Sequence, residues 1–306
     1  MNRPVIQCLT ASANDAARLA ALLDVAVQTI DVHRFPDGEL RVTVGPAAPT
    51  TIVYASLDQP NEKLLTLLLA AEALRRGGAT RLVLLAPYLC YMRQDTAFHQ
   101  GEAISQKVMG QLIAGAFDRV ITVDAHLHRT RNIADVFGGI EAEDLSAMPA
   151  IAEFLATHGL AAGTIVVGPD AESEPWVRDL ADRLSADFAV ARKVRHGDRS
   201  VEMAFADPSF FKGRPALLVD DIVSSGGTLI ACAKALLAAG ATSVDAIITH
   251  ALFPADMIAS FKASGLSSIR STHSVPHPTN AIELDAMFAA ALRKEIVGSD
   301  ARGRTS

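Results

Sequence analysis

The stretch Leu217–Leu229, LLVDDIVSSGGTL, combines residue types that suit a phosphorylated sugar. A hydrophobic run delivers Asp220 and Asp221, and small and hydroxyl residues then open a helical pattern: Ser224, Ser225, Gly226, Gly227 and Thr228. Small residues let backbone N–H groups approach an anion closely, hydroxyls add donors, and the helix dipole favours negative charge. Because two carboxylates repel a phosphate, we expect Asp220 and Asp221 to contact sugar hydroxyls or Mg²⁺. The alternative is an ordinary β–α turn capped by Ser and Gly.

A second group of candidate ligands is Asp124, His126 and His128, which alternate along the chain. In an extended strand the three side chains would share one face. The pattern fits a transition-metal site, but histidines with an ordinary place in a core or loop are commoner. No cysteine accompanies the three residues, which disfavours a dedicated zinc or copper site.

The composition limits the classes of protein to which the chain can belong. Half of its 306 residues are hydrophobic, which excludes a wholly disordered chain, and the length predicts two domains. The net charge of −6 predicts that it binds no nucleic acid. No apolar run approaches the roughly 18–20 residues that span a bilayer, and the first residues do not read as a secretory signal. Cys8, Cys90 and Cys232 lie far apart, which predicts free thiols and a cytoplasmic location.

The elements that must position these residues alternate along the chain. Short β-branched runs predict strands at Val5–Thr10, Leu40–Val44, Thr51–Ser56, Arg81–Tyr88, Arg119–Asp124, Thr164–Gly168, Phe188–Lys193, Val201–Phe205, Ala216–Asp220, Val244–Ala251 and Ser268–Val275. Apolar spacing predicts helices at Glu62–Arg76, Ala103–Ala116, Met148–His158, Ser173–Leu184, Gly227–Ala239 and Asp285–Arg293. Alternation of near-continuous apolar strands with helices predicts an α/β fold with mainly parallel sheets flanked by helices.

The chain also repeats itself. Residues 71–88 align without gaps on residues 233–250, and both segments contain Gly-Ala-Thr where a helix gives way to a strand. Chance similarity is the alternative, because helix–Gly–strand units are common in α/β proteins. The repeat favours two similar lobes, residues 1–145 and 146–306, with a boundary between residues 142 and 148. The last predicted helix is expected to fold back on the first lobe.

Leu217–Leu229 resembles the phosphoribosyl-diphosphate loop of the type I phosphoribosyltransferase fold. That resemblance alone leaves open transferases that consume the diphosphate and synthetases that make it. Other segments resemble motifs of ribose-phosphate diphosphokinases, also called PRPP synthetases, in the right order along nearly the whole chain. These segments are HRFPDGEL (33–40), PYLCYMRQD (87–95), GEAISQK (101–107), VDAH (123–126) and GPD (168–170).

The resemblance implies an activity and its partners. ATP and ribose 5-phosphate would give AMP and 5-phospho-α-ribose 1-diphosphate (PRPP) for nucleotide biosynthesis, with Mg²⁺ as the metal. The family builds its ATP site across subunits, so the resemblance also implies a homo-oligomer.

Roles for individual residues follow from the same resemblance. The ATP-binding residues would be Phe35, Asp37 and Glu39 from a neighbouring subunit, with Arg93, Gln94, Asp95 and His126. His126 and Asp170 would organise Mg²⁺, and Lys193 and Arg195 would be the mobile catalytic pair. The ribose 5-phosphate site would consist of Asp220, Asp221, Ser224, Ser225, Gly226, Gly227 and Thr228. Taken alone, the Pro-Asp-Gly stretch is a turn, the Arg-Gln-Asp stretch a solvated loop, and the charges near Lys193 a solvated hairpin.

Three residues depart from the family pattern. Ser224 stands where many members have Asp. A serine at this position occurs in a branch that resembles archaeal synthetases. Thr96 stands where other members place basic residues, and Glu172 adds a carboxylate after Asp170. Three alternatives therefore stay open: a phosphoribosyltransferase that consumes PRPP, a non-catalytic regulatory paralogue, and a diphosphokinase that acts on another sugar phosphate.

Overall fold

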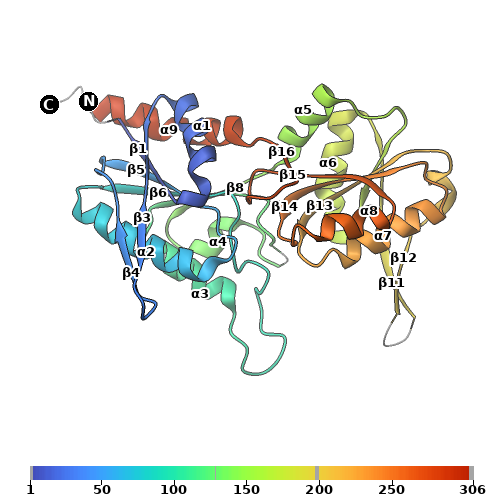
Figure 1. Ribbon diagram of the computed structural model, residues 1–306, viewed down its shortest axis with the longest axis horizontal. Coiled ribbons are helices and arrows are strands. Elements are labelled where there is room, and N and C mark those ends of the chain that lie inside the picture. Colours follow the sequence, from blue (N-terminus) through green and yellow to red (C-terminus); the bar gives the residue numbers. More distant parts are fainter. Residues whose placement is uncertain (1–2, 128, 197–199, 303–306) are drawn as a thin grey trace. The chain divides into compact units, whose positions relative to one another are not determined.

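The chain consists of two compact units. The computed structural model describes residues 3–127, 129–196 and 200–302, and only the backbone of residues 194–196, 200–202 and 297–302. Unit 1 comprises Met1–Leu145 together with Leu284–Ser306, and unit 2 comprises Ser146–Glu283 (Figure 1). Within the described parts, no helix is long and apolar enough to cross a membrane.

Unit 1 is built around a six-stranded parallel sheet with the order β2-β1-β5-β6-β7-β8. These strands are β1 (Val5–Cys8), β2 (Ala26–Thr29), β5 (Thr50–Tyr54), β6 (Arg81–Ala86), β7 (Arg119–Val123) and β8 (Glu141–Leu145). Helices α2 (Pro60–Arg76), α3 (Ser105–Ala114) and α4 (Ile133–Phe137) cover one face, and α1 (Ala13–Leu23) and α9 (Asp285–Arg302) cover the other (Figure 1). The short helix η1 (Thr10–Ser12) precedes α1, and β3 (Asp31–Arg34) and β4 (Leu40–Thr43) form a separate antiparallel hairpin.

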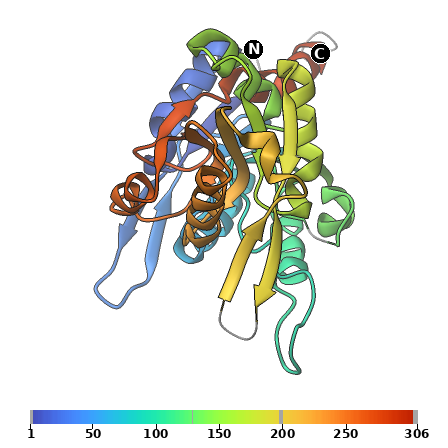
Figure 2. The ribbon, with the colours of Figure 1, turned by 90° about the vertical axis from the view of Figure 1, so that its right-hand side faces the viewer.

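Unit 2 has the same plan, with the strand order β10-β9-β13-β14-β15-β16. Its strands are β9 (Ile165–Gly168), β10 (Asp187–Val190), β13 (Ala216–Val223), β14 (Val244–Ala251), β15 (Leu266–Thr272) and β16 (Asn280–Ile282). Helices α5 (Met148–His158) and α6 (Glu174–Leu184) lie on one face, and α7 (Gly227–Ala238) and α8 (Met257–Ala263) lie on the other. The antiparallel hairpin of β11 (Arg192–His196) and β12 (Ser200–Ala204) projects from the unit (Figure 2), and η2 (Ala171–Ser173) and η3 (Pro208–Phe211) are single turns.

The apolar strands form the two cores. Every residue of β1, β5 and β7 is buried, as expected for parallel strands covered by helices on both faces. In unit 2 the same holds for β9, and β13 is buried up to Val219. The prediction of an α/β protein with two similar lobes, each a mainly parallel sheet flanked by helices, is confirmed.

The internal repeat occupies equivalent places in the two units. β5 and β13 are each third in their sheet, and β6 and β14 are each fourth. Gly78 and Gly240 follow the preceding helices with φ of +103° and +93°, which only glycine adopts readily. In both turns the next residue donates a 3.0 Å backbone hydrogen bond to a leucine carbonyl, Ala79 to Leu74 and Ala241 to Leu236. The Gly-Ala-Thr repeat is therefore the same helix cap built twice.

Two predicted strands need correction. Phe188–Lys193 is not one strand: β10 pairs in parallel with β9, the chain turns at buried Ala191, and β11 then pairs antiparallel with β12. The N–H of Ala191 donates to the carbonyl of Gly168, which fixes the point where the chain leaves the sheet. Strand β13 does not end at Asp220 but continues to Val223.

Candidate functional site

The functional candidates of unit 2 lie at and just beyond the carboxyl ends of β9 and β13. These strands are neighbours in the sheet. Asp170 follows β9, whereas Asp220 and Asp221 lie near the end of β13. Lys193 on β11 reaches the first of them, with 3.3 Å between Lys193 Nζ and Asp170 Oδ2. Carboxylates and a cation from three separate strands thus meet at the edge where parallel α/β sheets bind ligands.

The loop between β13 and α7 has the features of an anion site. Gly226 adopts φ +69°, and α7 begins at Gly227. The N-cap residue of α7 is Gly226, which has no side chain to accept hydrogen bonds from the first-turn N–H groups. First-turn N–H groups of a helix have no partner within the helix, and the dipole favours an anion there. Ser224 and Ser225 precede this turn, so hydroxyl donors and N–H groups belong to one short loop.

The two glycines of this loop have different structural roles. A Cβ on Gly226 would lie 2.6 Å from Cζ of Phe261 on α8, so helix packing excludes a side chain there. A Cβ on Gly227 would meet no atom within 4 Å. Gly226 is therefore needed for packing and for its left-handed backbone, whereas the space beside Gly227 is left open.

Asp220 lies in a strongly acidic environment. Burial raises the pKa of Asp220 well above its ordinary value, and the carboxylates of Asp221 and Asp170 raise it further. The Asp221 N–H donates to Asp220 Oδ1 at 3.1 Å, which partly offsets these effects. Such a site gains from a cation or from hydroxyl donors, because either one relieves the repulsion between buried carboxylates.

The segment after β9 holds Asp170 in place. Asp170 Oδ1 accepts a hydrogen bond from the N–H of Glu172 at 3.2 Å, and Ser173 Oγ donates to the Asp170 carbonyl at 2.5 Å. A side chain on Gly168 would collide with Ser173 Oγ. The carboxylate therefore sits at the start of a turn that leads into α6, with its other oxygen facing Lys193.

Oxygen ligands for a metal ion are present at the carboxyl ends of β9 and β13. The described residues contain no cluster of three His, Cys, Asp or Glu side chains able to hold a metal by themselves. His128, one of the three alternating candidates, lies outside the described residues. Carboxylate oxygens at Asp170 and Asp220 are the ligand type that Mg²⁺ accepts, and this ion commonly completes its shell with water and phosphate oxygens.

The expected adenine-pocket residues of unit 1 lie in the turn of the β3–β4 hairpin. The Phe35 N–H donates to the Glu39 carbonyl at 2.8 Å, and Asp37 Oδ1 accepts from the Glu39 N–H at 3.1 Å. Gly38 has φ +95°. The stretch is thus a genuine turn, and it leaves the Phe35 ring 38% exposed, packed edge-on against His33.

The Arg-Gln-Asp segment follows β6. Arg93 is exposed, and Gln94 accepts a hydrogen bond on Oε1 from Ser105 Oγ at 3.1 Å. Asp95 has another partner: its carboxylate accepts from the Arg129 N–H at 2.9 Å and from Arg129 Nη1 at 2.7 Å. Burial raises the pKa of Asp95, but the hydrogen bonds and charge of Arg129 outweigh this, so the net pKa is lowered.

His126 lies just beyond β7. The turn that carries it contains Asp124 at φ +38°, whose N–H donates to the Leu145 carbonyl at 2.9 Å. The Ala125 N–H donates to Asp144 Oδ1, also at 2.9 Å. β8 therefore orients the turn before His126.

The structure adds three residues to this part of unit 1 that the motifs did not single out. Arg129 pairs with Asp95, and Asp144 accepts a hydrogen bond from the turn before His126. Gln106 hydrogen-bonds to both Met92 and Thr130, in the loops that follow β6 and β7. Gln106 lies within the GEAISQK segment, so a motif contained it, but only the fold reveals its contacts. Arg195 lies on β11 opposite Val201, and its side chain is outside the described residues.

Comparisons with known proteins cover both units. Residues 5–116 match the family model of the N-terminal domain of ribose phosphate pyrophosphokinase. Residues 148–265 match the phosphoribosyl transferase domain.

Relatives and a solved structure match over nearly the whole chain. A ribose-phosphate pyrophosphokinase from the archaeon Methanopyrus kandleri is 32% identical over 277 residues, covering 90% of this chain and 94% of that one. One from Brucella melitensis is 35% identical over 274 residues, covering 87% and 86%. The crystal structure of phosphoribosylpyrophosphate synthetase from Mycobacterium smegmatis is 25% identical, with a TM-score of 0.84 and coverage of 97% and 99%.

Proposed function

Because the chain belongs to the ribose-phosphate pyrophosphokinase family, we propose that it transfers the diphosphoryl group of ATP to C1 of ribose 5-phosphate, giving PRPP and AMP for nucleotide biosynthesis. The observation that supports this most strongly is the edge of the unit 2 sheet. There, an uncapped helix start, two aspartates of β13 and the Lys193–Asp170 contact come together.

The sugar phosphate is bound by the loop between β13 and α7. The N–H groups and hydroxyls of Ser224–Thr228 bind the 5-phosphate, and the helix dipole adds to the attraction. Asp220 and Asp221 accept hydrogen bonds from the 2- and 3-hydroxyls. Hydroxyl donors to these carboxylates also relieve the repulsion that raises the pKa of Asp220. The pentose is therefore oriented at both ends, with C1 free to react.

Diphosphoryl transfer needs alignment and charge neutralisation more than covalent chemistry by the protein. The C1 hydroxyl attacks the β-phosphorus, and AMP leaves. Lys193 and Arg195 neutralise the charge of the moving group, and Arg93 binds the phosphates. Lys193 is already held over Asp170, at the same sheet edge as the sugar loop.

Asp170 of unit 2 would hold Mg²⁺ together with oxygens of the nucleotide, and His126 of unit 1 stays a second candidate ligand. When bound, the ion screens the phosphate charge and orients the triphosphate. Asp170 is suited to this role because the backbone N–H of Glu172 in η2 orients one of its carboxylate oxygens.

The nucleotide site is shared between subunits in this proposal. Phe35, Asp37 and Glu39 lie on an exposed hairpin turn, where a second copy can reach them. We place the reaction in the cytoplasm, which suits the three buried free cysteines.

The activity is tested by mixing the purified protein with ATP, ribose 5-phosphate and Mg²⁺ and quantifying AMP and PRPP by mass spectrometry. We expect equal amounts of both products without any nucleobase. Consumption of PRPP with a nucleobase, and no AMP from ATP, would instead identify a phosphoribosyltransferase. Faster AMP release with another sugar phosphate would change the substrate, and no turnover at all would favour a regulatory paralogue.

The shared site is tested by mixing two inactive variants, Phe35→Ala and Lys193→Ala, under conditions that allow subunit exchange. If Phe35 serves the neighbouring subunit, some mixed sites contain both native residues and activity returns. If both residues serve their own chain, every site in the mixture stays defective.

A further inference from the structure

The backbone of the segment that carries Arg93 is held in place by hydrogen bonds from Gln106. Gln106 lies in the first turn of α3, and only 7% of it is exposed. Its side-chain Nε2 donates to the Met92 carbonyl at 3.3 Å, and its backbone N–H donates to the Gln94 carbonyl at 3.1 Å. The carbonyls on either side of Arg93 are therefore both held by one residue.

The other end of the same amide holds the loop after His126. Thr130 Oγ1 donates to Gln106 Oε1 at 2.8 Å. Thr130 lies four residues beyond His126, and β6 and β7, from which the two loops extend, are neighbours in the sheet. Gln106 thus links the two loops through both ends of one buried amide group. Removing the hydrogen-bond partner at either end would leave a buried polar atom unsatisfied, which lowers stability.

A second link lies beside the first. Asp95 and Arg129 each adjoin a residue of the Gln106 bridge, and both carboxylate oxygens of Asp95 accept hydrogen bonds from Arg129. Only 2% of the Asp95 side chain is exposed. The Arg129 guanidinium also stacks over Phe98, 5.7 Å from the ring centre. Asp95 therefore faces the protein, and a nucleotide contact at this carboxylate would first have to displace Arg129.

We propose that Gln106, Thr130 and the Asp95–Arg129 pair are positioning residues that fix Arg93 relative to the turn carrying His126. The proposal rests on the nucleotide-binding roles proposed for Arg93 and His126. Arg93 itself is exposed and has a long, flexible side chain, so its placement depends on the backbone on either side of it. The Thr130–Gln106 hydrogen bond and the Arg129–Asp95 pair, both from the loop after His126, fix this backbone before the nucleotide binds.

This role differs from ordinary structural support in its kinetic consequence. A residue that only stabilises unit 1 would change thermal stability and leave the kinetic constants of the folded enzyme alone. A residue that aligns Arg93 and His126 affects ATP selectively, because the sugar loop belongs to unit 2. Misplacement of a reacting group by about 1 Å can cost about 100-fold in rate.

The test compares Thr130→Val with Thr130→Ser in the full-length protein. Valine keeps the shape of threonine but lacks the hydroxyl that donates a hydrogen bond to Gln106 Oε1, whereas serine retains this hydroxyl. We expect Thr130→Val to lower kcat/KM for ATP by about 10-fold to 100-fold, with an unchanged KM for ribose 5-phosphate. Because Gln106 Oε1 loses its hydrogen-bond donor, the melting temperature should also fall, while the variant stays folded at the assay temperature. Thr130→Ser should behave like the wild type.

Arg129→Met provides a second, independent variant should Thr130→Val fold poorly. It removes the guanidinium from Asp95 while keeping the backbone N–H, and it should show the same ATP-selective loss. An active wild type with unaltered ATP kinetics in both variants would overturn the positioning role. A parallel loss for both substrates that serine does not rescue would also overturn it. A wild type without turnover would refute the proposed function itself, so the two failures are distinguishable.

Discussion

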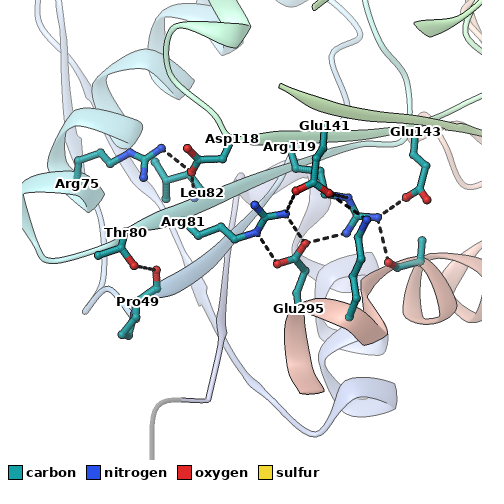
Figure 3. A network of polar contacts seen from close by, with 12 residues as sticks. Pro49, Arg75, Thr80, Arg81, Leu82, Asp118, Arg119, Glu141, Glu143 and Glu295 are labelled. Carbon is teal, nitrogen blue, oxygen red and sulfur yellow. Dashed lines mark hydrogen bonds and ion pairs between the residues drawn. The ribbon is translucent and has the colours of Figure 1, made fainter. Parts of the chain in front are cut away.

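Glu295 on α9 accepts a 2.9 Å hydrogen bond on Oε1 from Nη1 of Arg119 on β7, and the two side chains are 5% and 1% exposed (Figure 3). Arg81 on the neighbouring strand β6 donates to both oxygens of the same carboxylate, at 2.7 and 2.9 Å. Arg119 also donates to the Ala291 carbonyl at 3.1 Å. The last helix is thus attached to the first sheet by one carboxylate shared between two guanidinium groups, which also pair with Glu141 and Glu143.

Replacing this carboxylate should destabilise the protein strongly. Glu295→Ala removes the only buried carboxylate among the described partners of Arg119 and leaves it with Glu141 and Glu143, which are about half exposed. Breaking a buried ion pair typically costs about 3–5 kcal/mol. Lys294→Ala is the matched control, because Lys294 pairs with Glu141 at 3.0 Å in an exposed position, where pairs contribute about 0–1 kcal/mol. Urea denaturation followed by circular dichroism measures both variants. Equal small losses would show that α9 is held mainly by its apolar face.

The same carboxylate should make stability depend on pH in acid. Burial raises the pKa of Glu295, but the hydrogen bonds and charges of Arg81 and Arg119 outweigh this and leave the pKa lowered. A lowered pKa in the folded state means that the stabilisation is complete above the ordinary value of 4.5 and disappears as the pH falls below it. The stability gap between wild type and Glu295→Gln should therefore be constant from pH 7 to about 5 and shrink in more acid solution. A gap that widens on acidification would contradict this assignment.

The two glycines of the sugar loop should respond differently to substitution. Gly227→Val places its side chain in open space where the phosphate is expected, so ribose 5-phosphate binding should fall at least tenfold with little change in melting temperature. Gly226→Ala combines φ +69° with a collision at Phe261, so it should unfold at lower temperature. Isothermal titration and thermal melting separate the two effects. Normal affinity in folded Gly227→Val would refute the phosphate-binding role of this loop.

Local sequence patterns predict most of the regular elements but not the changes of direction between them. Apolar periodicity identifies α2, α3, α5, α6, α7 and α9, and α5 (Met148–His158) matches its predicted bounds. The eleven-residue helix α1 (Ala13–Leu23) is not among the predicted helices. The turn at Ala191 carries no Gly or Pro signal, so Phe188–Lys193 reads as one strand although β10 and β11 have different partners. The three-residue strand β16 and the five-residue helix α4 are too short to show periodicity.

For the candidate site, too, the sequence predicts individual residues but not the contacts between distant ones. Motifs single out Asp170, Lys193 and Asp220 as candidates because their residue types and their order along the chain resemble those of the family. Asp95 and Arg129 are 34 positions apart, and nothing near either residue indicates that they pair. Such contacts depend on which loops the strand order brings together, and the sequence carries no local signal of that order.

Lys193→Ala should separate binding from turnover. Lys193 Nζ lies 3.3 Å from Asp170 Oδ2, at the edge of the sheet where the diphosphoryl group is proposed to move. A cation that neutralises charge developing in the transition state affects kcat more than substrate affinity. We therefore expect kcat to fall by about 100-fold or more, with ribose 5-phosphate affinity by titration nearly unchanged. Lys262→Ala, which removes an exposed lysine of α8 in the same unit, should retain full activity. An unaltered kcat with a higher KM for ATP would mean that Lys193 only binds the nucleotide and has no special role in the transition state.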